Sequence, residues 1–273
     1  MKIGIIGTQN SHTDHFCKVL NEEKACAGAC AAYVYGGDDP EQAKKLAEQY
    51  GVEICASEEE LIEKSDVVAI TYRKGSMHFE PAMKVLKAGK PLFNDKPFTV
   101  NMAQCLELTN YARENNLLLT GGSNLKGMGS LQALKAQVKP GSLVTISFAA
   151  DCNSEYDGYW FYGMHSAEMC IALCGEEYTS VNSFKNGDAV VTIVTYADKQ
   201  CVICNATTSH DIKIAITNGD ETTYNFVALE YQSVGPQELV EMVNSGKLPR
   251  PLSHYEKSVE LVSRMVEAQK ANA

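Results

Sequence analysis

The sequence predicts an α/β protein in two parts: an N-terminal doubly wound parallel sheet and a C-terminal α+β domain with a largely antiparallel open sheet. Short apolar strands alternate with helices up to about residue 120, which is typical of a parallel sheet covered on both faces. After Gly121 and Gly122 several strands follow one another between Gly, Asp and Asn turns, which favours antiparallel pairing. A length of 273 residues suffices for two cores. We therefore expect domains at residues 1–120 and 121–273.

The first domain is expected to be Rossmann-like. Residues 1–7 form an apolar strand that ends in Gly7, and residues 11–20 form a helix capped by Asn10 or Ser11. Further strands and helices then alternate with short connections. The strands are expected at residues 31–35, 52–55, 67–71, 91–94 and 117–120, and the helices at 39–50, 58–64, 77–88 and 102–114.

The second domain mixes helices with adjacent strands. We expect helices at residues 131–138, 164–173 and 255–270, and strands at 143–150, 190–196, 201–207, 213–217 and 222–226. The last helix is long enough to pack back on either domain.

Composition excludes some classes of partner. Lys and Arg number 24 against 34 Asp and Glu, which gives a net charge of −10. No basic stripe offsets this charge, so nucleic acid is not an expected partner. The start of the chain lacks the apolar segment of a secretion signal, and no later stretch is long and apolar enough for a membrane span. We expect a cytoplasmic protein without a membrane partner.

The ten cysteines are predicted to be reduced core residues. Two pairs are four positions apart among apolar neighbours: Cys26 with Cys30, and Cys170 with Cys174. Cys201 and Cys204 are three apart in a strand-like run, which points them to opposite faces where they cannot share one zinc ion. Without a secretion signal, small buried thiols are the better interpretation, and no metal site is predicted.

Lys96 is the catalytic candidate. It follows the strand at residues 91–94, and ligands of open parallel sheets bind beyond the carboxyl ends of strands. Pro97 keeps Lys96 out of the helical region, so a rigid turn presents the ammonium. A lysine held in this way can orient a hydroxyl, or act as an acid or base when its pKa is lowered. An isolated Lys-Pro is more often a lysine that only solvates a strand exit.

Two motifs resemble the Gfo/Idh/MocA family of sugar and polyol oxidoreductases. Residues 67–122 contain Asp95-Lys96-Pro97 where that family has Glu-Lys-Pro after its fifth strand. The run YGMHSAEMCIALCG resembles the family's Gly-x-His-x-x-Asp helix start, with Gly163, His165 and Glu168 on the motif positions. The C-terminal segment EYQSVGPQELV and the long helix after it also resemble the family, so the resemblance covers nearly the whole chain.

The resemblance implies an NAD(P)-dependent oxidoreductase that acts on a sugar- or polyol-type alcohol or carbonyl by hydride transfer. It implies that Lys96 binds and polarises the reacting oxygen and that His165 is the acid/base. It also implies a cis peptide bond between Lys96 and Pro97, and a homo-oligomer, dimer or tetramer, formed through the open C-terminal sheet.

The glycine fingerprint of such a cofactor site is altered here. The run GTQNSH has Gly7 at the first position, but Gln9 at the second and His12 at the third. The free N–H groups of a helix N-terminus still attract a phosphate. Asp38 follows the second strand and is the candidate for the ribose, and the lack of Arg or Lys in that turn favours NAD over NADP. The expected cofactor-binding residues are Gly7, Thr8, Gln9, Asn10, Ser11, Asp38, Thr71 and Lys96.

The substrate side also departs from the family. The aspartate usual four positions before the histidine is Phe161 here, so we expect Asp157 or Glu168, together with Asp95, to supply carboxylates. A satisfied core histidine is the competing interpretation of His165.

Two further alternatives stay open. His12 and His15 share one helix face and could join His165 and Glu168 in a metal site if the domains close, although no HExxH pattern supports this. The chain could then be a non-redox acid/base or metal-assisted lyase at the same cleft. It could also be a cofactor-free ligand-binding or regulatory protein of the same fold.

Overall fold

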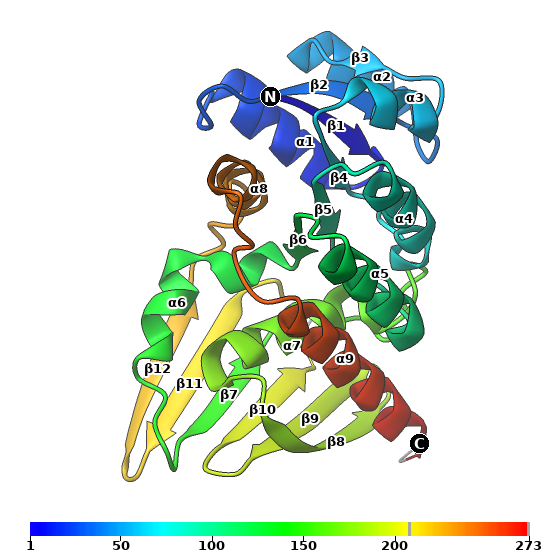
Figure 1. Cartoon of the computed structure of the whole chain (residues 1–273). Helices are drawn as coiled ribbons and strands as arrows, with labels where there is room; N and C mark the ends of the chain where they lie inside the picture. Colours follow the sequence, from blue (N-terminus) through cyan, green and yellow to red (C-terminus); the bar gives the residue numbers. More distant parts are fainter. Residues whose placement is uncertain (207–208, 272–273) are drawn as a thin grey trace. The chain divides into compact units, whose positions relative to one another are not determined.

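The computed structural model describes residues 1–206 and 209–271, and the chain forms two compact units (Figure 1). Unit 1 comprises Met1–Thr99, Ala103–Asn124 and Tyr231–Ser253. Unit 2 comprises Val100–Met102, Leu125–Glu230 and His254–Ala273. The segment at Tyr231–Ser253 thus clusters with the first unit although it follows the sheet of the second.

Unit 1 is built on a six-stranded sheet in the order β3-β2-β1-β4-β5-β6. Every strand pair in it is parallel, which confirms the predicted Rossmann-like, doubly wound sheet. The strands are β1 Lys2–Ile6, β2 Cys30–Tyr35, β3 Glu53–Ile54, β4 Val67–Ile70, β5 Leu92–Asp95 and β6 Leu119–Gly122. Residues of β1, β4 and β5 are almost all fully buried because helices cover both faces.

The helices of unit 1 form two layers. Side chains of α1, α2 and α8 pack on one face of the sheet in a shared core around Ile3 and Phe93. On the other face, Gly4 lets α3 come close, because a Cβ there would lie 2.1 Å from Ser65 Oγ. The helical segments are α1 Ser11–Cys17, the π-helical η1 Lys18–Glu22, α2 Pro40–Tyr50, α3 Glu58–Lys64, η2 Gly75–Met77, α4 Phe79–Lys87, α5 Met102–Glu114 and α8 Val234–Ser245.

Unit 2 contains a second six-stranded sheet in the order β12-β11-β7-β10-β9-β8. Its pairs are antiparallel except β7 with β10, as the sequence predicts. In Figure 1 the helices α6, α7 and α9 lie on one face of this sheet. The elements are η3 Asn124–Gly127 at the unit boundary, α6 Gly129–Lys135, β7 Leu143–Ser147, α7 Trp160–Cys174, β8 Tyr178–Asn186, β9 Ala189–Tyr196, β10 Gln200–Asn205, β11 Ile212–Asn218, β12 Glu221–Val227 and α9 Ser253–Ala271.

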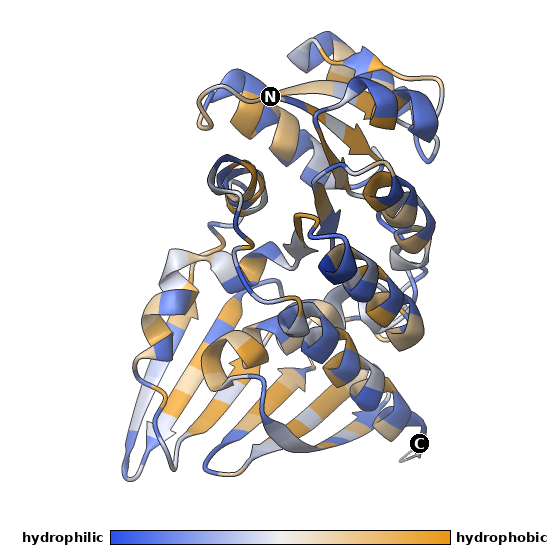
Figure 2. Cartoon of the chain, viewed as in Figure 1, coloured by the Kyte–Doolittle hydropathy of each residue, from blue (hydrophilic) through white to orange (hydrophobic). Residues whose placement is uncertain are grey.

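The sheet of unit 2 has one buried and one half-exposed face. Along β9 and β10 buried residues alternate with half-buried ones, which is the pattern of a sheet covered by helices on one side only. Figure 2 shows hydrophobic residues concentrated in the central strands of both sheets and hydrophilic stripes on the helices. No helix in the described ranges is long and apolar enough to cross a membrane.

Some elements differ from the expectation. Strand β8 and helix α8 were not expected, and α7 begins at Trp160 rather than near residue 164. Strand β8 is an edge strand with mostly exposed or half-buried residues, so its sequence YTSVNSFKN carries little apolar alternation. The strand expected at residues 201–207 ends at Asn205 in the structure, and its last expected residue, Thr207, lies outside the described residues.

Candidate active site

Lys96 lies directly after β5, at the carboxyl end of the parallel sheet. The Lys96–Pro97 peptide bond is cis, which confirms that prediction. The Lys96 side chain is only 3% exposed. Burial lowers its pKa to about 8, with Asp95 opposing the shift and Arg73 adding to it. An amine with this pKa can give up or accept a proton near neutral pH.

Asp95 precedes Lys96 and is fully buried. Its Oδ2 accepts a hydrogen bond from His12 Nδ1 at 2.7 Å and one from Asn10 Nδ2 at 3.2 Å. Burial by itself would raise the pKa of Asp95, but the positive charges of His12 and Lys96 hold it below the usual value. The carboxylate is therefore ionised, and its Oδ1 accepts no hydrogen bond from a described residue.

His12 stands where the glycine fingerprint has its third glycine. Its ring is buried, stacks on His15 with 5.7 Å between centroids, and lies 5.9 Å from the ring of Tyr231. Because Nδ1 is bonded to Asp95, the side chain links the start of α1 to the end of β5. His12, which replaces the third glycine of the fingerprint, thus has a structural role in unit 1.

The turn between β1 and α1 keeps the backbone of a cofactor-binding turn. Gly7 has φ +95°, and a Cβ there would lie 2.6 Å from the backbone N of Tyr72, so only glycine fits. The Gly7 carbonyl accepts hydrogen bonds from the hydroxyls of Thr13 at 2.7 Å and Thr71 at 2.9 Å. Thr71, a predicted cofactor contact, is buried and holds this turn. Asn10 caps α1 through its bond from His12 N.

Asp38 is anchored on the same turn. It accepts hydrogen bonds from the amide of Thr8 at 2.8 Å, the amide of Gln9 at 3.1 Å and the Thr8 hydroxyl at 3.3 Å. A carboxylate offers about four lone-pair sites, and four hydrogen bonds from Thr8 and Gln9 reach Asp38 Oδ1 and Oδ2 here. Gln9 and Ser11 are exposed, whereas the amides of Thr8 and Gln9 are already bonded to Asp38.

His165 lies in unit 2, near the middle of α7, and is 6% exposed. Its ring packs against Phe148 and Tyr162, with centroids at 5.8 and 5.4 Å. Gly163 on the same helix allows a close contact, because a Cβ there would lie 2.5 Å from the ring of Tyr159. His165 is thus held in an aromatic pocket whose walls fix its ring.

No sequence motif points to His210. This exposed histidine packs against Phe148 and Tyr162, the same two rings that hold His165. Its ring centroid lies 6.1 Å from that of Phe148 and 5.3 Å from that of Tyr162. It follows β10 in a stretch without motif or apolar periodicity, so only the folded chain reveals its neighbourhood. Unit 2 therefore has a second titratable ring beside this aromatic group.

Glu168 is fully buried one turn after His165. Its Oε2 lies 2.8 Å from Lys126 Nζ and 3.5 Å from His254 Nε2. Burial would raise the pKa of Glu168, but Lys126 and His254 lower it to about 2. The carboxylate is therefore the anion of an internal ion pair, and Lys126 is a partner that the sequence did not indicate.

The remaining predicted residues are divided between the two units. Asp157 is half-buried in the turn before α7 at φ +67°, a conformation that Asp tolerates better than most residues. Of the four residues of the alternative metal site, His12 and His15 belong to unit 1, and His165 and Glu168 to unit 2. His12 and Glu168 already have charged partners within their own units, Asp95 and Lys126.

Comparison with known proteins identifies the N-terminal part. Residues 1–123 match the model of the family described as "Oxidoreductase family, NAD-binding Rossmann fold". This region is a Gfo/Idh/MocA-family domain. The inositol 2-dehydrogenase of Gluconacetobacter diazotrophicus is 29% identical to the chain over 146 residues, which is 52% of the chain and 42% of that relative. The curated relatives that match are covered over only 31 to 50% of their length.

Solved structures of the Gfo/Idh/MocA kind extend the likeness in fold to the whole chain. A putative myo-inositol dehydrogenase from Sinorhizobium meliloti superposes with a TM-score of 0.83 at 18% identity, covering 100% of this chain and 98% of that one. An Agrobacterium radiobacter oxidoreductase, solved with NAD+, L-tartaric acid and magnesium, gives 0.80 at 14% identity over 100% and 97% of the two chains. At these identities the likeness concerns the fold of both units.

Proposed function

We propose that the protein is an NAD-dependent oxidoreductase that acts on a sugar- or polyol-type alcohol or carbonyl by hydride transfer. The observation that carries this proposal is Lys96: a buried lysine with a pKa of about 8, beside an ionised carboxylate, at the carboxyl end of β5 in a Gfo/Idh/MocA-family domain. Names of relatives and fold neighbours, inositol 2-dehydrogenase among them, support a polyol substrate.

Lys96 is proposed to bind the reacting oxygen. As an ammonium it donates a hydrogen bond that stabilises negative charge on that oxygen, and as an amine it accepts the hydroxyl proton during oxidation. Asp95 keeps part of the population protonated, because its charge raises the pKa of Lys96 against the effect of burial. The bound nicotinamide would accept the hydride that leaves the alcohol carbon, or return it to a carbonyl.

His165 is proposed as the acid/base of unit 2. Its ring is nearly buried and oriented by Phe148 and Tyr162, so it can carry a proton at a fixed position. Asp157 and Glu168 are proposed as substrate-side carboxylates, with Glu168 acting through its ion pair with Lys126.

The cofactor is proposed to bind at the turn after β1. Asp38 would accept a hydrogen bond from a ribose hydroxyl, and the backbone at Asn10 and Ser11 would face the phosphates. No Arg or Lys occurs between Gly36 and Pro40, which favours NAD over NADP because a ribose phosphate would lack a cationic partner.

The test combines cofactor binding with turnover. NADH and NADPH are titrated separately against the protein while nicotinamide fluorescence and thermal stability are followed, and NADH is expected to bind more tightly. Inositol and related polyols are then assayed with NAD. Lys96→Met should abolish turnover while leaving the fold intact. Absence of binding by either nucleotide at millimolar concentration would overturn the proposal in favour of a cofactor-free binding protein.

We also propose that the half-exposed face of the unit 2 sheet joins copies of this chain. Phe184, Tyr224 and Phe226 are 51, 77 and 80% exposed. The strand register places Tyr224 opposite Ala215, and Phe226 opposite Lys213. Because residues two apart in a strand point to the same face, Tyr224 and Phe226 lie together on the half-exposed face of the sheet. Exposed aromatic side chains on an open sheet are typical of protein interfaces, and a second copy is the partner proposed.

A further inference from the structure

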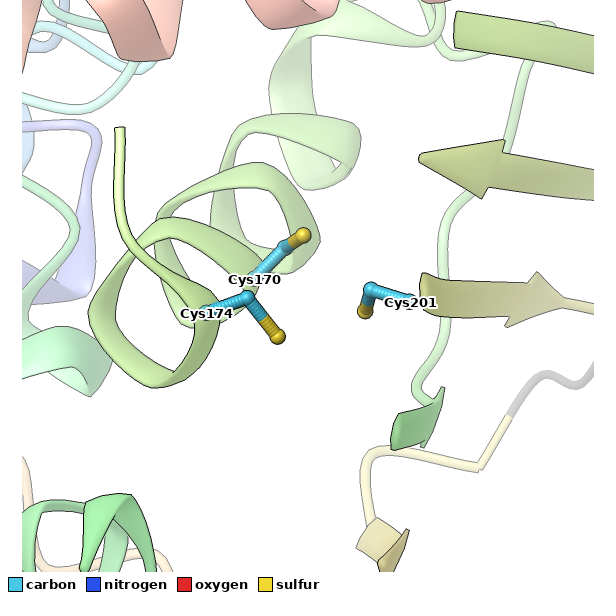
Figure 3. A group of neighbouring side chains, drawn as sticks. All are labelled: Cys170, Cys174 and Cys201. Atoms are coloured by element: carbon cyan, nitrogen blue, oxygen red, sulfur yellow. The ribbon is translucent and has the colours of Figure 1, made fainter. Parts of the chain in front are cut away.

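Three cysteines that are distant in sequence meet inside unit 2. Cys170 and Cys174 lie on α7, and Cys201 lies on β10. Their three sulfur atoms are within 4.8 Å of one another, and Figure 3 shows the two helical side chains extending toward the strand that carries Cys201. We propose that Cys170, Cys174 and Cys201 bind one soft metal ion, Cu(I), through their sulfur atoms.

Secondary structure fixes this convergence. Residues four apart lie on the same face of a helix, so Cys170 and Cys174 both face the sheet. Cys201 pairs with Val144 on one side and Val194 on the other. Cys201 and these two valines are fully buried. Cys201 therefore points to the helix-covered face, whereas Cys204, three residues later, is half-buried and points to the other face. The separation of Cys201 from Cys204 is as the sequence predicts, and the partners of Cys201 come from α7.

The distances suit a shared ion. Metal–sulfur bonds of about 2.3 Å place three sulfurs about 4 Å apart around a trigonal centre. The observed separations, all within 4.8 Å, need only small rotations of the side chains to reach that value. A cysteine side chain turns about a single χ1 angle, so the adjustment requires no movement of the backbone.

The donor set selects the type of metal. Thiolate sulfur is a soft ligand that favours Cu(I), Zn²⁺ and iron–sulfur clusters over hard cations. Structural zinc sites are four-coordinate, but among the described residues the group holds three cysteines and no histidine or carboxylate. Cys170 and Cys201 are fully buried and Cys174 is 7% exposed, which disfavours water as a fourth ligand. Three buried sulfurs match the trigonal coordination that Cu(I) accepts.

Tyr196 is a polar neighbour of the cluster. Its hydroxyl lies 3.5 Å from Cys170 Sγ and 3.1 Å from the carbonyl of Gly175, to which it can donate its proton. On metal binding the hydroxyl can turn its proton from the Gly175 carbonyl to Cys170 Sγ, and a hydrogen bond to a thiolate reduces the cost of its negative charge. Binding of Cu(I) displaces the thiol protons to solvent and changes no oxidation state.

A copper titration tests the site on the whole protein. Reduced protein under nitrogen is titrated with Cu(I) in competition with the chelator bathocuproine disulfonate. The wild type should retain one equivalent and develop thiolate-to-copper charge-transfer absorption in the near ultraviolet. Cys174→Ser and Cys201→Ser should lose that equivalent and the absorption. Cys204→Ser, a change on the other face of the same strand, should keep both.

Further measurements keep the proposal falsifiable if a variant folds poorly. Circular dichroism establishes that each variant is folded, and Tyr196→Phe, which leaves all three sulfurs, should weaken Cu(I) retention by about tenfold or more. Unchanged Cu(I) retention in folded Cys174→Ser and Cys201→Ser would overturn the site, as would the absence of any retained copper in the wild type. Retention of Zn²⁺ in place of Cu(I) in a parallel titration would overturn the choice of metal.

Discussion

His12 Nδ1 lies 2.7 Å from Asp95 Oδ2, and both side chains are buried in unit 1. This contact ties the turn after β1 to the strand end that carries Lys96. The histidine takes the position of a fingerprint glycine, and the aspartate takes the position of the family's glutamate. The two departures from the family pattern are therefore partners of each other.

We predict that His12→Ala destabilises the protein by about 1–3 kcal/mol, because a buried carboxylate loses its hydrogen-bond partner. Chemical denaturation of His12→Ala, Asp95→Asn and the double variant measures the effect. The double-mutant cycle should give a coupling energy of at least about 0.5 kcal/mol. Additive effects of the two changes would show that the contact contributes nothing.

The titration of Lys96 gives a second prediction. Its pKa of about 8 in the fold lies below the ordinary value of 10.5, so the unfolded chain binds more protons between these values and stability rises with pH in this range. Lys96→Met should remove that rise. Denaturation at a series of pH values compares it with wild type, and Lys74→Met, at an exposed lysine of the same unit, serves as the control. Parallel pH profiles of wild type and Lys96→Met would contradict the lowered pKa.

Asp95 should act on Lys96 in a definite direction. Because the Asp95 charge raises the pKa of Lys96 against the effect of burial, Asp95→Asn is expected to lower that pKa further. NMR of isotope-labelled lysine amines follows the titration directly, with Lys96→Arg assigning the signal. A Lys96 signal that titrates at higher pH in Asp95→Asn would rule out this electrostatic arrangement.

The ion pair of Lys126 and Glu168 gives a prediction for unit 2. Lys126→Met leaves a fully buried carboxylate without its closest cation and should cost about 3–5 kcal/mol. The folded-state pKa of Glu168, about 2, lies below its usual 4.5, so wild type has this stability above pH 4.5 and loses it toward pH 2. That acid-dependent loss should shrink in Lys126→Met.

Two variants control for the change in side chain at position 126. Lys126→Met with Glu168→Leu should recover most of the lost stability, because no buried charge remains. Lys135→Met alters an exposed lysine nearby in α6 and should change little. If the double variant is no more stable than Lys126→Met, the cost arises from packing rather than from an isolated charge.

The proposed contact between copies predicts a change of oligomeric state. Phe226→Asp places a charge on the half-exposed face of the unit 2 sheet and should reduce the molar mass measured by light scattering after gel filtration. Thr223→Asp is the matched control, because residue 223 is also exposed but points to the opposite side of β12. A wild-type protein that is monomeric at high micromolar concentration would exclude the interface.

Local patterns account for most elements of the fold. Helix α2 covers Pro40–Tyr50 within the expected residues 39–50, and the bounds of α3 and α5 match the expectation, because helix signals and apolar periodicity depend on adjacent residues. Strand β6 differs, ending at Gly122 rather than Thr120. A Cβ on Gly121 would lie 1.8 Å from the carbonyl oxygen of Asn94, so these glycines continue the strand where the backbones of β5 and β6 come close.

The sequence by itself determined the parallel sheet of unit 1 and the largely antiparallel sheet of unit 2, because the alternation of strands, helices and turns is set by residues that are neighbours along the chain. The cis bond between Lys96 and Pro97 is what the resemblance to the family implies. Tertiary structure decided which side chains meet. Packing of α1 against the sheet brings His12 to Asp95, and packing of α7 brings Glu168 to Lys126 and two cysteines to Cys201. Such contacts join residues separated by tens of positions, and their geometry and electrostatics exist only once burial has removed water from between them.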